Sequence, residues 1–287
     1  MTLNEIIETT MKEAIIFILS HLRYEFKEAD THNSVIFYGE INNDLIEAIA
    51  HYLVGIRACA IDAALNIRAD LIGDTDEDKI ELYADICSIV GENNNALTMD
   101  QIQDERNPWL SEGIFHLFMN ISTRLTNIHP PGLIIALDLP HVSAKDKGLD
   151  LMALYLFGDN LGISIIETKA YKDDPNKAIN KAVNYFKEIE QGKHAPRIRQ
   201  SIQTMRTSLP PSFQKLVSSS LWKKNRSYIP NPHYDASVPM NWSNRRPSLN
   251  DLSVGKTRII IMPHIINNFD TFFNSISENM RDFARGL

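Results

Sequence analysis

Glu167, Thr168 and Lys169 form an acid-x-lysine triplet near the middle of the chain. The triplet ends the run 163–168 (ISIIET), which is apolar and β-branched like a strand covered on both faces. Alternation along a strand places Glu167 and Lys169 on one face. A carboxylate and an ammonium are costly to bury unless another group compensates them. The sequence therefore predicts either a functional site or a structural ion pair here.

Asp150 is the candidate third member of this group. It lies in the preceding apolar run, 149–157, and a hairpin-like connection at 158–160 (GDN) would bring it beside Glu167. A divalent cation is the natural partner of two adjacent carboxylates, and a site of oxygen ligands alone favours Mg²⁺ or Mn²⁺ over zinc. Such an ion polarises a phosphoryl oxygen and lowers the pKa of a bound water. Lys169 would orient that water and offset charge on the phosphate.

The strand context carries this prediction more than the triplet does. The chain has two further acid-x-lysine triplets, 25–27 (EFK) and 77–79 (EDK). We expect the first to lie in a helix over 3–26, where residues two apart point in different directions, and the second at a solvated helix start. The alternative for the central triplet is a Glu167 to Lys169 ion pair at a strand end, with Asp150 in a turn.

The elements around the triplet are predicted in the order helix, strand, strand, strand, helix. Asn107-Pro108 begins the first helix, because proline is preorganised for a first turn. Asp174 caps the last helix and Gly192 ends it. The expected elements are a helix over 107–125, strands over 133–139, 149–157 and 163–168, and a helix over 174–191.

Further elements are expected on both sides of this core. The amino-terminal part predicts a helix over 3–26, a strand over 34–41 and helices over 44–64 and 77–90. The carboxyl-terminal part predicts helices over 196–207 and 211–223, a long irregular stretch, a strand over 257–262 and a helix over 268–284.

The net charge of −7 is distributed very unevenly. Residues 1–110 carry seven basic and 21 acidic side chains, whereas 192–258 carry 12 basic residues against Asp235 and Asp251. Such asymmetry points to a polyanionic partner, and its alternative is a solvated loop that lacks acids. We expect two domains, an acidic region over 1–105 that either binds a partner or masks the basic segment, and a second domain over 106–287 with a basic insertion at about 192–256.

Several basic residues are candidates for contact with nucleic acid. Lys172, Lys177 and Lys181 follow the triplet, and they either meet a phosphate backbone or form a solvated face. In the basic segment, cations alternate with aromatics, which suits unwound nucleic acid unless the aromatics anchor a loop to the core. These residues are Arg197, Arg199, Arg206, Lys223, Lys224, Arg226, Arg245 and Arg246, with Trp222, Tyr228, Tyr234 and Trp242.

The run 148–183 (GLDLMALYLFGDNLGISIIETKAYKDDPNKAINKAV) resembles the core of the PD-(D/E)XK nuclease superfamily, whose elements follow the same order. The resemblance implies a restriction-endonuclease-like fold, a mixed sheet flanked by helices. It implies that Asp150 and Glu167 hold Mg²⁺ or Mn²⁺ and that Lys169 assists the attacking water. Glu112, at a predicted helix start (SEGI), matches an additional glutamate of many members; its alternative is an ordinary first-turn acid.

The layout over 107–191 is more closely similar to the HamA nuclease family of Hachiman anti-phage defence systems, and 255–287 resembles it loosely. This resemblance implies a metal-dependent DNA nuclease that works with a helicase or ATPase partner, which restrains it until infection. One departure concerns the residue before the catalytic acid, often proline in the superfamily and here Leu149.

Composition and motifs exclude several other classes of protein. Cys59 and Cys87 cannot build a disulfide framework, and the chain lacks a phosphate-binding glycine loop, a dinucleotide-binding glycine pattern and a G-x-S-x-G elbow. No apolar run approaches the ~20 residues of a membrane span, and no signal-peptide pattern is present, so we expect a cytoplasmic protein. Ligand spacing is missing around His129, His141, His194, His233 and His264, for which we expect no role.

The sequence thus predicts an α/β protein with a restriction-endonuclease-like core and an acidic, mostly helical amino-terminal part. The expected activity is Mg²⁺-dependent hydrolysis of DNA phosphodiesters. The alternative is a non-catalytic nucleic-acid or protein-binding subunit, in which the same residues form an ion pair on a scaffold.

Overall fold

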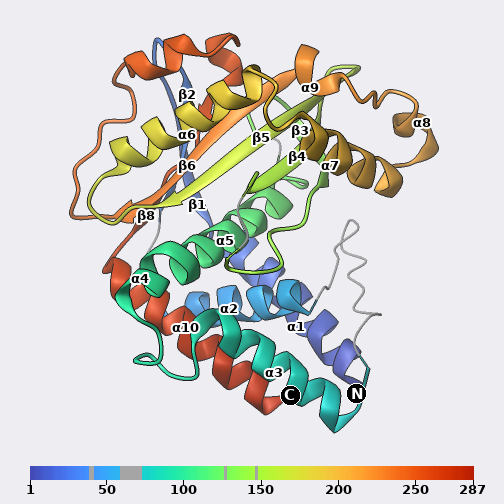
Figure 1. Cartoon of the computed structure of the whole chain (residues 1–287), viewed down its shortest axis with the longest axis vertical. Helices are drawn as coiled ribbons and strands as arrows, with labels where there is room; N and C mark the ends of the chain where they lie inside the picture. The colour runs from blue at the N-terminus through green and yellow to red at the C-terminus, as the bar shows by residue number, and fades with distance from the viewer. Residues whose placement is uncertain (39–41, 59–72, 126–127, 146–147) are drawn as a thin grey trace.

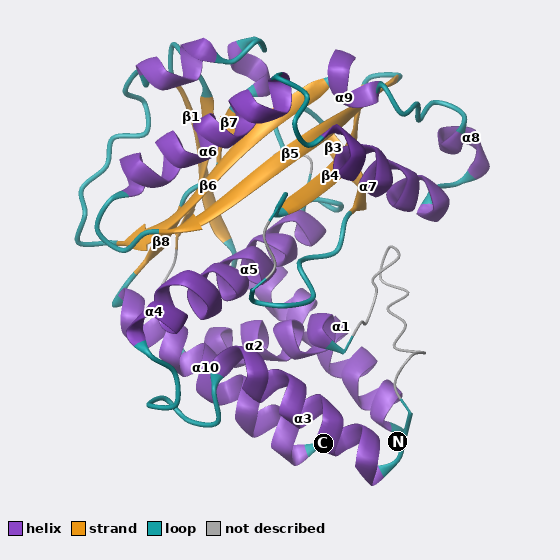
Figure 2. Ribbon diagram, viewed as in Figure 1, coloured by secondary structure: helices purple, strands orange, loops and turns teal. Residues whose placement is uncertain are grey.

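One mixed β-sheet with helices on both faces organises the chain (Figures 1 and 2). The computed structural model describes residues 1–38, 42–58, 73–125, 128–145 and 148–287. The strands are β1 (Arg23–Glu28), β2 (Asn33–Tyr38), β3 (Leu133–Leu137), β4 (Leu151–Phe157), β5 (Asn160–Ala170), β6 (Arg226–Asp235), β7 (Ile260–Ile261) and β8 (His264–Ile266).

Helices precede, follow and interrupt these strands. The longer ones are α1 (Leu3–His21), α2 (Asn43–Arg57), α3 (Asp76–Val90), α5 (Asn107–Ile121), α6 (Pro175–Glu190), α7 (Ala195–Ser208) and α10 (Phe269–Gly286). Short turns of helix are α4 (Met99–Gln101), α8 (Pro211–Gln214) and α9 (Leu221–Lys224), together with a π-helical turn over Ile102–Arg106 and 3₁₀ turns over Pro247–Asp251 and Lys256–Arg258.

The sheet has the strand order β1-β2-β8-β6-β5-β4-β3, and β7 also pairs with β2. Strands β3, β4 and β5 form an antiparallel meander, whereas β5, β6, β8 and β2 run parallel. Strand β1 returns antiparallel along β2 at one edge. The elements α5, β3, β4, β5 and α6 therefore follow the predicted order, and the sheet is mixed, as expected.

Alternation along the strands divides the apolar side chains between two layers. On β4, Ala153 and Tyr155 pack with α1, α2, α5 and α10, whereas Met152 and Leu154 pack with α6 and α7 on the opposite face. Figure 1 shows α6 and α7 on one side of the sheet and the amino-terminal helices with α10 on the other. The sheet thus includes residues from both sides of position 105, and so does the core layer that contains Ala153, Tyr155 and residues of α1, α2, α5 and α10.

The caps of α6 follow the prediction. Asp174 accepts a hydrogen bond from the backbone N–H of Lys177, which satisfies one of the free donors of the first turn. Pro175 occupies the first helical position. Gly192 follows the last turn with φ +85°, a conformation that favours glycine.

The helix expected over 3–26 ends earlier, at His21, and this prediction is wrong over its last residues. Burial on α1 recurs through Ile18, after which the chain becomes extended at Leu22 and forms the edge strand β1. The 25–27 triplet therefore lies on a strand, where Glu25 and Lys27 form an ion pair at 3.4 Å. Its side chains are exposed, so it resembles the central triplet in geometry but not in burial.

The stretch expected to be irregular contains β6, a strand at the centre of the sheet. Pro230 and Pro232 disfavour such a strand because neither can donate a backbone hydrogen bond. Successive residues of a strand direct their backbone hydrogen bonds to opposite neighbours. The carbonyl oxygen of His233 accepts from the N–H of Tyr171, just after β5, at 3.0 Å, so the odd-numbered residues of β6 face β5. The two prolines are even-numbered, and β6 therefore loses no hydrogen-bond donor on the β5 side. On the opposite side, the carbonyl oxygen of Pro230 accepts a hydrogen bond from the N–H of Met262 at 3.0 Å, which needs no donor from the proline. Pairing of β6 with β8 begins only after the prolines, at His233.

Two other predicted elements are shorter than expected. The helix expected over 211–223 is broken into α8 and α9, and the strand expected over 257–262 is reduced to β7 after a 3₁₀ turn. The helix expected over 44–64 is observed as α2, which ends at Arg57. Residues 59–64 of the predicted range lie outside the described residues. None of the described helices combines the length and apolar character needed to cross a membrane.

Gly132 offers a direct test of the β3 and β4 pairing. A Cβ at this position would lie 1.7 Å from the backbone oxygen of Leu156, whereas nothing lies within 4 Å of a Cβ at Gly255. We expect Gly132→Ala to lower the free energy of unfolding by about 1–3 kcal/mol, since backbone must move, and Gly255→Ala to change it by less than about 0.5 kcal/mol. Chemical denaturation measures both, and equal stabilities would contradict this pairing.

Candidate metal centre

The pairing of β4 with β5 brings Asp150 to Glu167. Leu151 pairs with Ile166 at the end of the ladder, so the next position places Asp150 opposite Glu167. The backbone N–H of Thr168 donates to Oδ2 of Asp150 at 2.7 Å, which fixes this carboxylate against the end of β5. The predicted encounter of the two acids therefore follows from strand register.

Lys169 lies between these two carboxylates. Its Nζ is 2.6 Å from Oε1 of Glu167 and 3.7 Å from Oδ2 of Asp150. Burial disfavours the charged form, but the two carboxylates outweigh it and hold the pKa of Lys169 above its usual range. Lys169 is therefore a cation and a hydrogen-bond donor in this arrangement.

Glu167 is the most deeply buried of the group, with 4% of the residue exposed. Burial, followed by the charge of Asp150, raises the pKa of Glu167 to about 8 against the opposing effect of Lys169. One carboxylate oxygen, Oε1, contacts Lys169, whereas Oε2 is buried and has no hydrogen-bond partner among the residues that the structure describes. An unpartnered carboxylate oxygen is costly, and a cation is one group that would satisfy it.

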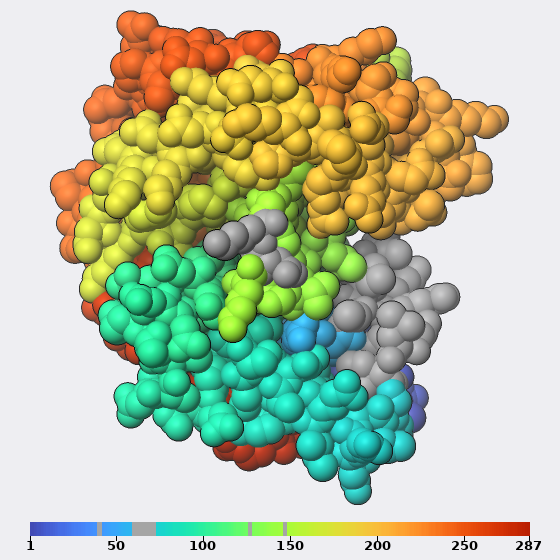
Figure 3. All heavy atoms as spheres, viewed as in Figure 1, coloured from blue at the N-terminus to red at the C-terminus, as the bar shows by residue number. Residues whose placement is uncertain are grey.

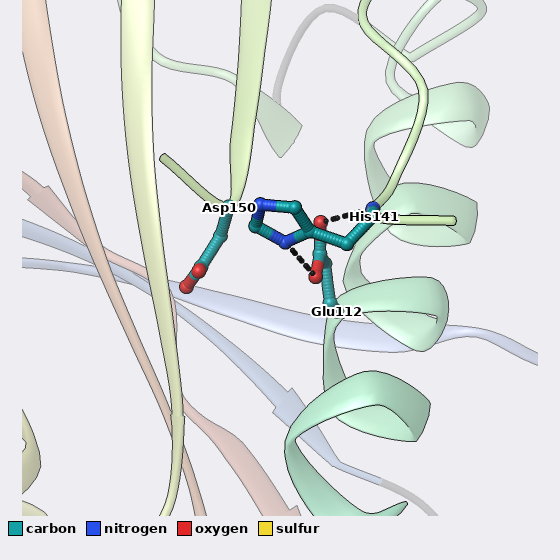
Figure 4. A group of neighbouring side chains, drawn as sticks. All are labelled: Glu112, His141 and Asp150. Atoms are coloured by element: carbon teal, nitrogen blue, oxygen red, sulfur yellow. Dashed lines mark hydrogen bonds and ion pairs between the residues drawn. The ribbon is translucent and has the colours of Figure 1, made fainter. Parts of the chain in front are cut away.

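Glu112 enters the site from α5 and contacts the chain after β3. Its Oε1 accepts from the backbone N–H of His141 at 3.0 Å, and its Oε2 lies 3.0 Å from Nδ1 of the same residue (Figure 4). Burial, opposed by the His141 hydrogen bond, raises the pKa of Glu112 to about 7. The indole N–H of Trp109 also donates to the carbonyl oxygen of His141 at 2.9 Å, so α5 positions this loop through two side chains.

Glu112, His141 and Asp150 each offer a ligand atom, and these atoms all lie within 4.8 Å of one another. Figure 4 shows the three residues entering from α5, the loop after β3 and the start of β4, with the His141 ring between the carboxylates of Glu112 and Asp150 in this view. This donor set is two carboxylates and one imidazole, and Glu167 is linked to it through Lys169, which contacts both Glu167 and Asp150. Carboxylates suit Mg²⁺ and Mn²⁺, and an imidazole is better suited to Mn²⁺ and later transition metals than to Mg²⁺. The residues present therefore fit the predicted divalent ion.

A cavity of about 650 Å³ opens onto this group. Glu112, His141, Asp150, Lys169 and Lys172 are among the residues that line it. The chain between β3 and β4, yellow-green in Figure 3, reaches the surface between the helices of the amino-terminal third and α6. The carboxylate group is thus accessible to a molecule larger than water.

The lysines predicted to contact nucleic acid are exposed beside the cavity. Lys172 and Lys177 line it, while Lys177 and Lys181 each lie 5.3 Å from the ring centre of Tyr171. Lys172 also pairs with Asp270 at 2.5 Å. On α7, Arg197 and Arg199 are exposed. Burial raises the pKa of Asp138, just after β3, and the positive charge of Arg197 opposes that rise. These positions are compatible with a bound polyanion, and their role in binding remains a prediction.

The interleaved aromatics of the basic segment do not form a stacking surface. Trp222, Tyr228, Tyr234 and Trp242 are each no more than 4% exposed and belong to the core layer under α6. The alternative interpretation, in which aromatics anchor the segment, is therefore confirmed. Arg226 is likewise engaged, pairing with Glu190 at 3.2 Å.

His141 is the member of the group that sequence reasoning set aside. It follows β3 in a loop, and no second histidine or cysteine stands at ligand spacing. The one available signal is its place just after an apolar strand, where side chains from neighbouring strands meet. No protein-family model matches the sequence, and no curated protein matches it significantly.

A thermal-shift measurement tests the metal site. Because an ion that binds only the folded state stabilises it, Mn²⁺ at about 100 times its Kd should add about 2.7 kcal/mol and raise Tm by several degrees. We expect Asp150→Asn to abolish the increase. Asp159→Asn, at the exposed β4–β5 turn, is the matched control and should retain it. A shift that survives Asp150→Asn would show that Mn²⁺ binds elsewhere.

Proposed function

We propose that the protein is a metal-dependent DNA nuclease with a restriction-endonuclease-like core. The observation that carries the proposal is the convergence of Asp150, Glu167 and Lys169 at the end of adjacent strands, beside an accessible cavity. Two carboxylates and a lysine in this arrangement match the requirements of phosphodiester hydrolysis, which are a cation site and a fixed positive charge.

Asp150 and Glu167 would hold the ion, Mg²⁺ or Mn²⁺, with Glu112 and His141 as additional ligands or as partners of its bound water. The bound ion would supply Lewis-acid polarisation of the phosphoryl oxygen and a more acidic water. The buried position of Glu167 favours this role, because its unpartnered Oε2 would gain a positive neighbour.

Lys169 keeps its proton, so it acts as a donor rather than as a base. Its ammonium would orient the attacking water or a phosphate oxygen by hydrogen bonding and offset the developing negative charge. Glu112 is better suited to accept a proton, because its pKa of about 7 lies near neutral pH, where a general base works best. Its hydrogen bonds to His141 hold it in place for that step.

The surrounding charges support an anionic polymer as the substrate. Lys177 and Lys181 extend from the cavity along an exposed face of α6, and Arg197 and Arg199 continue on α7. A phosphate backbone that crosses these helices would present its phosphates to successive cations, and each contact would contribute to a salt-dependent affinity.

The similarity to HamA nucleases extends the proposal to a biological setting. We infer an effector subunit of a cytoplasmic anti-phage complex, in which a helicase or ATPase partner restrains the nuclease. The acidic region 1–105 is the proposed partner-binding part, since its six basic and 21 acidic residues would repel DNA.

Nuclease assays test the proposed site with an internal control. With Mg²⁺ or Mn²⁺ and linear DNA, Glu167→Gln and Lys169→Gln should each lower the cleavage rate by about 10²–10³, since each removes a group from the reacting centre. EDTA should stop the reaction. Glu25→Gln and Lys27→Gln change the same triplet pattern on the exposed strand β1 and should leave the rate unchanged.

The assay is run on the isolated chain and on the complex purified with its native partner. A restraining partner would silence the complex, and a missing trigger would silence the isolated chain. Cleavage that survives the Glu167→Gln, Lys169→Gln double change would contradict the site. DNA binding without cleavage in both preparations would favour the non-catalytic alternative.

Salt dependence tests the proposed DNA path. Replacing Lys177 and Lys181 by Gln should reduce the slope of log K against log salt by about 1.4 to 1.8, because each lost phosphate contact contributes about 0.7 to 0.9. Lys187→Gln is the matched control on α6, since Lys187 already pairs with Asp251 at 2.7 Å. An unchanged slope in the double variant would place the DNA elsewhere.

A further inference from the structure

A second cavity, of about 660 Å³, shares none of its described lining residues with the cavity beside the carboxylate group. Its walls come from α1, α2, β2, α5, β8 and α10. They are mainly apolar and include the rings of Phe37, Phe118 and Phe272. The polar residues among the described lining are His21, Arg23, Tyr38, Asn42, His264 and Asn267.

His264 places a hydrogen-bonding group in the wall of this cavity, which a simple packing defect would lack. It lines the cavity and is 7% exposed, and its ring meets those of Phe118 and Phe272 edge-on at 5.2 and 5.7 Å. Its Nδ1 lies 3.2 Å from Nδ1 of His233. Two neutral imidazoles can make this contact only if one nitrogen carries a proton and the other does not.

Asn231 determines which nitrogen carries the proton. Its Nδ2 donates to the carbonyl oxygen of Met262, which can only accept, so its Oδ1 is the atom that faces His233. Nε2 of His233 lies 2.6 Å from that Oδ1 and must therefore be the protonated nitrogen. Burial lowers the pKa of His233 well below its usual value, so the ring is neutral and its Nδ1 is an acceptor.

The same logic assigns the protons of His264. Because Nδ1 of His233 accepts, Nδ1 of His264 must donate, and burial lowers the pKa of His264 to about 3, which leaves its Nε2 unprotonated. Among the described residues no group donates to this Nε2, and it is not sealed from the cavity. The cavity thus presents one fixed hydrogen-bond acceptor in an apolar, aromatic wall.

We propose that this cavity binds a small neutral aromatic molecule with an N–H or O–H donor, of the indole or phenol class, whose donor meets Nε2 of His264. Aromatic walls favour a planar ring through edge-to-face and stacked contacts. Arg23 is one of the lining residues, and its positive charge disfavours a cation. The volume is that of an ordinary small-molecule site.

Two measurements on the unaltered chain test the proposal, and neither needs metal or DNA. ¹⁵N NMR of the histidines should find His264 with its proton on Nδ1 and His233 with its proton on Nε2. Titration should give saturable binding of indole and about three- to tenfold weaker binding of 1-benzofuran, its isostere without the donor. A proton on Nε2 of His264, equal affinities, or no saturable binding of indole would overturn the proposal.

A blocking variant locates the bound molecule. Leu45 is half-buried and lines the cavity, so Leu45→Trp should place an indole ring in it and weaken the binding of free indole. Leu216→Trp makes the same change at a position that is 50% exposed and outside the described lining, and it should bind indole like the unaltered chain. Undiminished binding by Leu45→Trp would overturn the assignment of indole to this cavity.

Discussion

The ammonium of Lys169 sits between the carboxylates of Glu167 and Asp150, at 2.6 and 3.7 Å, and this contact is the constraint on which the site depends. Without it, the buried carboxylate of Glu167 and the half-buried carboxylate of Asp150 would repel each other at a poorly solvated strand end. The ion pair still leaves Oε2 of Glu167 unsatisfied. That buried oxygen is the position at which a bound cation would add stability, and it is the basis of the proposed metal site.

The surrounding fold serves to hold these charges in register. The β4–β5 ladder sets Asp150 opposite Glu167, and β6 covers the other edge of β5 along its whole charged end. Helix α5 supplies Glu112, which holds the loop after β3 in place through two hydrogen bonds with His141. The amino-terminal strands complete the same sheet, so the acidic third of the chain is built into the scaffold that carries the site.

Much of this was predictable from local pattern. Strand alternation and the 158–160 turn predicted that Asp150 and Glu167 would meet, and Asp174 marked the start of α6. Strand β6 was not predictable, because its prolines fit only where pairing with β8 is interrupted. His141 was missed for a similar reason, since its partner Glu112 lies 29 residues away and is brought near by packing.

Anomalous diffraction from a crystal grown with Mn²⁺ tests the central claim most directly, because it locates the ion without relying on activity. We expect an anomalous peak in direct contact with the carboxylates of Asp150 and Glu167, with Lys169 displaced from one of them. An Mn²⁺-saturated crystal in which Lys169 still bridges both carboxylates, with no peak beside them, would show that the cluster is a structural ion pair.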